Sequence, residues 1–126
     1  HGIAAIKDPK LMDHLRDTQI PLEICPTSNL FTRKFATSIE NHPIRAFYDH
    51  GMYVTVNTDD PTLFGVELTD EYLKLIDHGI FSVGEVIALI KKGIGATFQT
   101  EEHKQAILAD LDAVIANSTF ASKLSS

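Results

Sequence analysis

Two adjacent carboxylates, Asp59 and Asp60, follow an apolar run and are the residues of this sequence best suited to chemistry. Apolar and polar residues alternate over 52–57, which predicts a buried β-strand that Pro61 prevents from continuing. Two like charges at the end of a hydrophobic strand are unfavourable unless a cation or a donor compensates them. A divalent metal bound by one carboxylate, with a substrate donor bound by the other, would do so. The simpler alternative is a turn, because Asp-Asp-Pro is common turn chemistry.

The histidine–glycine pair at 1–2 is a second candidate for a functional role. The same pair recurs at 50–51 and 78–79, where each pair is predicted to end an amphipathic helix with glycine at the left-handed cap position. No helix precedes His1, so this explanation does not apply to it, and a frayed terminus is the alternative to a functional role. The chain opens on His1 rather than Met, and we expect further sequence upstream.

A third candidate segment follows a second predicted strand, over 20–25. The polar stretch 25–42 lacks clear periodicity and is interpreted as a long loop of the kind that is often functional. For the side chains of 27–29, local turn hydrogen bonding is favoured over direct catalysis. Cys25 has no Cys-His signature around it and is expected to be a buried, unreactive cysteine. Glu23 is interpreted as a satisfied structural carboxylate, with a catalytic acid as the less favoured alternative.

The two strands, with a loop and a helix between them, form one β/α repeat. Such a repeat predicts parallel strands with a right-handed connection, and functional groups in the loops at the carboxyl ends of the strands. The Asp59-Asp60 pair follows one such strand end, and the segment 25–29 follows the other. His1 would follow a third if a strand precedes it. In an extended strand end, the side chains of Asp59 and Asp60 should diverge toward different targets.

Capping residues predict where the helices begin. The predicted starts are Asp8-Pro9, Pro43, Thr69, Ser82 with Glu85 in a capping box, and Thr100; an interruption is expected near Gly93 and Gly95. The last helix should turn one apolar face to a core, with Ile107, Leu108, Leu111, Val114 and Ile115. The polar tail 118–126 is expected to be frayed.

Composition limits the classes of partner. The 126 residues suffice for one modest domain, and 44% hydrophobic with 22% charged residues is typical of globular proteins. A net charge of -6 argues against nucleic acid and anionic membranes as partners. The sequence contains no membrane-length apolar run and no visible signal peptide. A single cysteine cannot form an internal disulfide, so a cytoplasmic location is expected.

Four motifs, taken in order, closely resemble the end of adenosine deaminase-type enzymes. They are His1-Gly2, Cys25-Pro26-Thr27-Ser28-Asn29, His42-Pro43, and Asn57-Thr58-Asp59-Asp60-Pro61 with Phe64 and Glu71-Tyr72. The resemblance extends from His1 to about Val114. It implies an α/β fold, the C-terminal portion of a (β/α)₈ TIM barrel with the end of strand 6, strands 7 and 8, and C-terminal helices. Residues 1–126 would then be the C-terminal part of a single deaminase barrel domain whose N-terminal part is missing.

The resemblance also implies an activity, namely zinc-dependent hydrolytic deamination of a 6-aminopurine nucleoside, adenosine to inosine plus ammonia. In such enzymes Asp59 would be a zinc ligand, and Asp60 would bind the purine edge near N7. His1 would be the catalytic histidine that orients and helps activate the zinc-bound water. Adenine and aminodeoxyfutalosine are alternative substrates. A noncatalytic α/β module that retains the pattern is the alternative from another class.

This sequence departs from the family by what it lacks. It has no counterpart of the family's paired histidine ligands, of its third histidine ligand or of the glutamate that shuttles the proton. A complete barrel also needs about 250 residues. We therefore expect one zinc ion per active site, with the remaining ligands supplied by the missing N-terminal part, and expect the 126 residues alone to be inactive. The His-x-Glu and Pro-Cys-x-x-Cys signature of zinc cytidine deaminases is absent as well.

Overall fold

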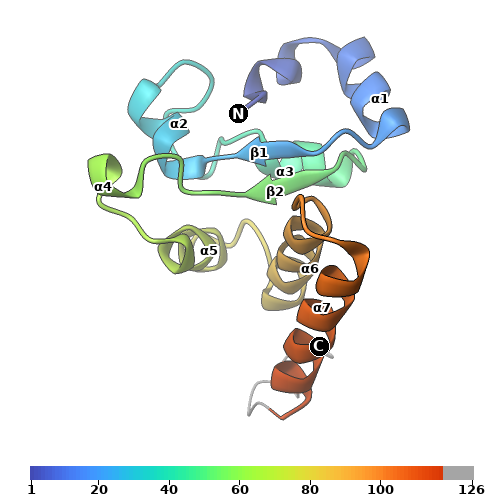
Figure 1. Ribbon diagram of the computed structural model, residues 1–126. Coiled ribbons are helices and arrows are strands. Elements are labelled where there is room, and N and C mark those ends of the chain that lie inside the picture. Colours follow the sequence, from blue (N-terminus) through green and yellow to red (C-terminus); the bar gives the residue numbers. More distant parts are fainter. Residues whose placement is uncertain (118–126) are drawn as a thin grey trace.

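A two-stranded parallel sheet lies at the centre of the computed structural model, which describes residues 1–117. Strand β1 (Leu22–Ile24) pairs with β2 (Val54–Val56), and Glu23 is aligned with Thr55. Figure 1 shows both strands running in the same direction, with helical segments between them along the chain. The predicted parallel strand–helix–strand unit is therefore confirmed.

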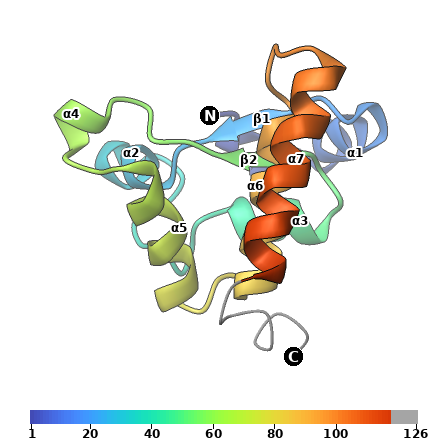
Figure 2. The same ribbon diagram turned by 60° about the horizontal axis from the view of Figure 1, so that its bottom comes forward.

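Short and medium helices surround the sheet within the described residues. They are the 3₁₀ helix η1 (Ile3–Lys7) and the α-helices α1 (Pro9–Thr18), α2 (Pro26–Thr32), α3 (Ile44–Asp49), α4 (Pro61–Phe64), α5 (Leu68–Asp77), α6 (Val83–Gly95) and α7 (Glu101–Ala116). Helices α5 and α6 both contact β2, and α7 lies along α6 in Figures 1 and 2. None of the helices described in residues 1–117 has the length and apolar character needed to span a membrane.

The hydrophobic core forms where one face of the sheet meets the helices. Residues alternate between the two faces of a strand, so Ile24, Val54 and Val56 face this core, while Glu23 and Thr55 lie on the opposite face. Complete burial of one such aliphatic side chain stabilises the fold by about 1.5–3 kcal/mol. The helices and their flanks contribute Met12, Leu15, Ile44, Phe47, Met52, Leu75, Phe81, Val86 and Leu89.

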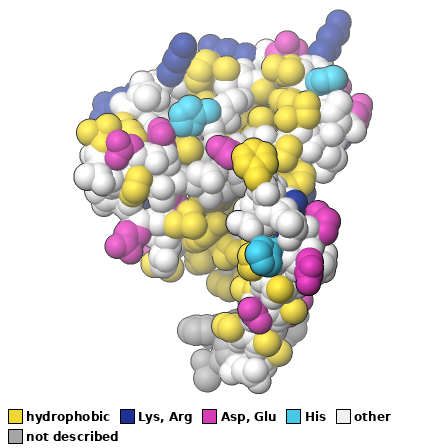
Figure 3. Space-filling model, in the orientation of Figure 1, with side chains coloured by type: hydrophobic (Ala, Val, Ile, Leu, Met, Phe, Trp, Pro, Cys, Tyr) yellow, Lys and Arg dark blue, Asp and Glu magenta, His cyan; other side chains and the backbone are white. Residues whose placement is uncertain are grey.

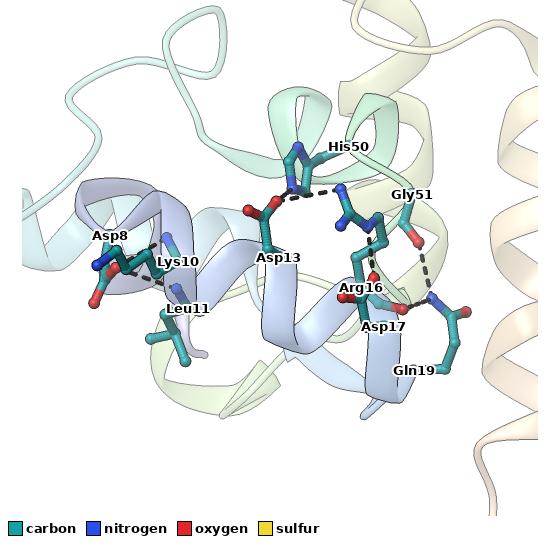
Figure 4. Close-up of polar contacts among 9 residues, drawn as sticks. All are labelled: Asp8, Lys10, Leu11, Asp13, Arg16, Asp17, Gln19, His50 and Gly51. Atoms are coloured by element: carbon teal, nitrogen blue, oxygen red, sulfur yellow. Dashed lines mark hydrogen bonds and ion pairs between the residues drawn. The ribbon is translucent and has the colours of Figure 1, made fainter.

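Polar contacts join α1 to the segment that precedes β2 (Figure 4). Asp8 caps the first turn of α1 through its carboxylate, as the sequence predicts. Further along the helix, Asp13 Oδ1 lies 2.8 Å from Nε2 of His50, which follows α3 directly. Just beyond the end of α1, Gln19 Nε2 donates to the carbonyl oxygen of Gly51 at 2.9 Å. These contacts hold the amino-terminal sides of β1 and β2 together.

The capping residues predict the start of two of the last three helices correctly and the start of one incorrectly. Ser82 accepts from the backbone of the third helical residue and belongs to a capping box, and Thr100 likewise caps α7. The prediction for Thr69 is wrong because α5 already begins at Leu68, with Glu67 as its N-cap. The physical reason is a reciprocal pair in which the Asp70 carboxylate accepts from the Glu67 backbone N–H at 2.8 Å.

The predicted interruption near Gly93 and Gly95 is wrong at Gly93, through which α6 passes, and confirmed at Gly95, where the helix ends. A Cβ atom at Gly95 would lie 2.9 Å from the hydroxyl oxygen of Tyr53. That hydroxyl donates to the carbonyl oxygen of Lys92 at 2.6 Å. Gly95 therefore allows close approach of α6 to the residue that precedes β2.

Helix α7 does not bury the apolar face that the sequence predicts. None of its residues is fully buried, and Ile107 and Val114 are exposed. Leu108, Leu111 and Ile115 are half-buried, and α6 is the element that α7 contacts most. A helix with one close neighbour covers only one stripe of its surface, which explains the difference. The tail 118–126 lies outside the described residues.

Candidate active site

Asp59 and Asp60 lie just beyond β2 and point to different targets. The Oδ2 atom of Asp59 accepts from the Ser28 hydroxyl at 2.8 Å, whereas Oδ1 of Asp60 accepts from the backbone N–H of Leu63 at 2.8 Å and caps α4. The predicted divergence is confirmed, but its origin differs from the extended strand end that the sequence suggests. Asp59 has φ +62°, in the left-handed region that Asp tolerates better than most residues, and this turn separates the two carboxylates.

His1 lies beside Asp59. Its Nε2 atom is 3.5 Å from Asp59 Oδ2, and the two side chains are 67% and 39% exposed. The backbone nitrogen of His1 donates to the carbonyl oxygen of Glu23 in β1. Gly2 follows with φ +85°, and a Cβ atom there would lie 3.1 Å from the Leu22 side chain. His1 is thus held against β1 and beside Asp59, which argues against the frayed-terminus alternative.

The first part of the predicted 25–42 loop is helix α2, so the loop interpretation is wrong there. Pro26 occupies its first position, where a missing N–H costs nothing, and Cys25 provides no side-chain cap. The carboxylate of Glu71 on α5 replaces that cap, because its Oε2 accepts from the Thr27 N–H at 3.2 Å. Glu71 is completely buried, and its Oε1 has no partner in the described part of the chain. The sequence places Glu71 in a family motif but gives no signal of this contact.

His42 anchors the same helix from the other side. Its Nδ1 accepts from the Ile44 backbone N–H at 3.0 Å, so Nε2 carries the proton and donates to Asn29 Oδ1 at 2.9 Å. Burial lowers the pKa of His42 from 6.5 to about 4. The imidazole is therefore neutral near pH 7 and acts as a structural hydrogen-bonding group.

Two further sequence interpretations concern β1 and its end. Cys25 is buried as predicted, and burial, reinforced by the nearby Asp59 carboxylate, raises the pKa of its thiol. Glu23 is exposed, and within residues 1–117 its carboxylate has no hydrogen bond or ion pair. The structural partner predicted for this carboxylate is therefore not found within residues 1–117.

These groups surround an open cleft of about 870 Å³. Its lining includes His1, Glu23, Cys25, Asn57 and Asp59, together with the apolar side chains of Leu68 and Phe98. A second cleft, of about 460 Å³, adjoins it at Glu23, Asn57 and Phe98 and continues between β2 and helices α5 and α6. Figure 3 shows hydrophobic side chains gathered on the face between α5 and α6. Polar groups that could do chemistry thus border an apolar hollow, as in many small-molecule sites.

The donor atoms present suit a zinc ion but do not complete its site. Zinc takes carboxylate oxygens and imidazole nitrogens, and a catalytic site provides three protein ligands with one open position. Asp59 and His1 bring one group of each kind to the cleft. Residues 1–117 contain no cluster of three or more His, Cys, Asp and Glu side chains placed to hold a metal. Asp59 fits a metal centre only as one member of a larger ligand set.

Comparison with known proteins agrees with this geometry. A family model described as adenosine deaminase matches residues 1–114. Over 89% of this chain, the sequence is 42% identical to an adenosine deaminase of Clostridium acetobutylicum and 39% identical to an aminodeoxyfutalosine deaminase of Streptomyces avermitilis. The fold superposes on the crystal structure of an adenine deaminase from Arthrobacter aurescens with a TM-score of 0.87, at 30% identity over 92% of this chain.

The chain therefore belongs to the adenosine deaminase family of hydrolases. It spans only about a third of the proteins that it matches, 33% and 31% of the two relatives and 35% of the solved structure. Its two-stranded parallel sheet and surrounding helices are consistent with part of an α/β barrel.

Proposed function

We propose that residues 1–126 form the C-terminal part of one deaminase barrel domain that hydrolyses adenosine to inosine and ammonia with a single zinc ion. In this proposal β1 and β2 are barrel strands 7 and 8, and His1 ends strand 6. The observation that carries it is the meeting of Asp59, at the carboxyl end of β2, with His1, which is held against β1, beside an open cleft. Active sites of such barrels lie at this end.

The contact between the His1 backbone nitrogen and the Glu23 carbonyl oxygen supports the strand assignment. A bond of this kind continues a sheet on the side of β1 away from β2. Glu23, exposed on the face opposite the core, would face the interior of a closed barrel. A carboxylate enclosed there requires a donor or cation, which the remainder of the barrel would provide.

Each of three side chains has a role in this proposal. Asp59 would hold the zinc ion, which when bound lowers the pKa of a coordinated water to about 7. His1, whose Nε2 lies 3.5 Å from Asp59 Oδ2, would orient that water and accept its proton at Nε2. Asp60 Oδ1 already accepts from the Leu63 N–H and caps α4, and its Oδ2 has no partner among the described residues. That second oxygen would accept a hydrogen bond from the protonated N7 edge of the purine.

The substrate is tested on the protein purified from its complete reading frame. We expect one zinc ion per polypeptide by metal analysis and ammonia release from adenosine, while adenine and aminodeoxyfutalosine are assayed in parallel. Faster turnover of either alternative would reassign the substrate and leave the reaction class intact. A full-length protein that deaminates none of the three would contradict the proposed function and favour the noncatalytic module.

The isolated 126 residues serve as a control for the barrel assignment. They expose Phe98 completely and leave Glu23 without a partner, so we expect them to be inactive and to aggregate or to associate with the remainder of the barrel. Cooperative unfolding as a soluble monomer, together with adenosine turnover, would show that the partial-barrel assignment is wrong.

A further inference from the structure

We propose that Ser28 is a positioning residue that orients the Asp59 carboxylate for metal binding, an inference that rests on the metal-ligand role proposed above. The Ser28 hydroxyl donates to Asp59 Oδ2 at 2.8 Å, and Ser28 itself is only 4% exposed. No other hydrogen bond to the Asp59 carboxylate is present in residues 1–117, where its remaining polar contact is His1. Ser28 is therefore the group that selects the orientation of this carboxylate.

Ser28 can do this because both of its neighbours in the chain are anchored. On one side the Thr27 N–H donates to the fully buried Glu71 carboxylate, and on the other Asn29 accepts from the buried His42 ring. The two anchors come from different parts of the chain, α5 and the segment before α3. They fix the backbone of Ser28 from both directions, so its hydroxyl has a defined position relative to the end of β2.

The arrangement also assigns different tasks to the two oxygens of Asp59. Oδ2 accepts from Ser28 and lies near His1, while Oδ1 has no hydrogen-bond partner among the described residues. Oδ1 is thus the oxygen left for a cation. Outer hydrogen bonds to a ligating carboxylate restrict its rotation before the metal arrives, and their removal commonly weakens metal binding by about 10- to 100-fold.

The test compares Ser28→Ala with wild type in the full-length protein, with the zinc Kd measured by chelator competition on the apoprotein. We expect the Kd to rise about 10- to 100-fold in Ser28→Ala. Ser28→Thr retains the hydroxyl and should bind zinc within a few-fold of wild type. Ser38→Ala is the matched control, because the Ser38 hydroxyl accepts from the Asn41 backbone N–H in an exposed turn and bonds the exposed Glu40 carboxylate, so its loss should leave the Kd unchanged.

A double-mutant cycle separates positioning from a general structural role. If Ser28 acts through Asp59, Ser28→Ala should raise the zinc Kd of Asp59→Ala no further. An unchanged Kd in Ser28→Ala, or an equal loss with and without Asp59, would overturn the inference while wild type still binds zinc and deaminates adenosine. A wild-type protein that binds no zinc would instead overturn the metal role of Asp59, and the role of Ser28 with it.

Discussion

Asp59 Oδ2 lies within 3.5 Å of His1 Nε2, although the two residues come from opposite sides of the β1 strand in sequence. Neither is held by local structure alone. His1 is fixed through its backbone contact with Glu23, and Asp59 is fixed through the Ser28 hydroxyl. The pair exists because His1 lies against β1 while Asp59 follows β2, the strand paired with β1.

His1→Ala in the full-length protein should lower kcat far more than it raises KM. General acid–base groups contribute about 10²- to 10⁴-fold to rate, and His1 is placed to exchange a proton beside Asp59. Steady-state kinetics with adenosine gives both parameters. His103→Ala is the control, because the ring of this exposed α7 histidine is hydrogen-bonded to Gln99, and the variant should retain full turnover. Near-normal kcat in His1→Ala would show that His1 has no catalytic role.

The two aspartates should separate metal binding from substrate binding. Asp59→Ala removes a proposed zinc ligand, so zinc content and activity should fall together. Asp60→Asn keeps an oxygen that can cap α4 but removes the charge, so zinc should stay while kcat falls. A hydrogen bond to a charged group is worth about 1.5–3 kcal/mol, or about 10- to 150-fold in rate. Metal analysis beside kinetics decides this, and equal zinc loss in both variants would show that the pair is assigned wrongly.

His42 should make stability depend on pH in the acidic range. Its folded-state pKa of about 4 lies below its ordinary 6.5, so between these values the unfolded chain binds a proton that the folded chain does not. The stabilisation is complete above pH 6.5 and is lost as pH falls toward 4, at up to about 1.4 kcal/mol per pH unit.

Urea unfolding of the full-length protein between pH 4.5 and 7 measures this slope. His42→Gln can still donate to Asn29 but does not titrate, so the variant should show a reduced slope, whereas exposed His103→Gln should not. The same slope in wild type and His42→Gln would show that His42 does not titrate as described.

Cys25 should react slowly with thiol reagents despite lining the cleft. It is almost completely buried, and burial raises the pKa of its thiol, so little thiolate is available near pH 8. We expect a disulfide reagent to label it much more slowly in the folded full-length protein than in urea. Labelling at equal rates in both conditions would indicate an exposed thiol and reopen a nucleophilic role.

The amino-acid sequence by itself determined the features that depend on near neighbours. Asp8, Ser82 and Thr100 each cap a helix through donors two or three residues away, and alternation over a few residues identifies β2. The order of the four motifs at 1–2, 25–29, 42–43 and 57–61 was also enough to identify the family. These signals are local or linear, and so they survive without knowledge of the fold.

Only the tertiary structure decided which groups meet. Helix α2 has no side-chain cap from its own N-cap residue, and the Glu71 carboxylate on α5 accepts from its Thr27 N–H instead. Because the capping group is distant in the chain, the sequence of 25–42 resembles an unstructured loop. Asp59 likewise adopts its left-handed backbone at the end of β2. The hydrogen bond that the Ser28 hydroxyl donates to its carboxylate depends on the pairing of β1 with β2. Contacts of this kind join residues far apart in the chain, and no periodicity or capping pattern encodes them because their energy exists only once the strands and helices have packed.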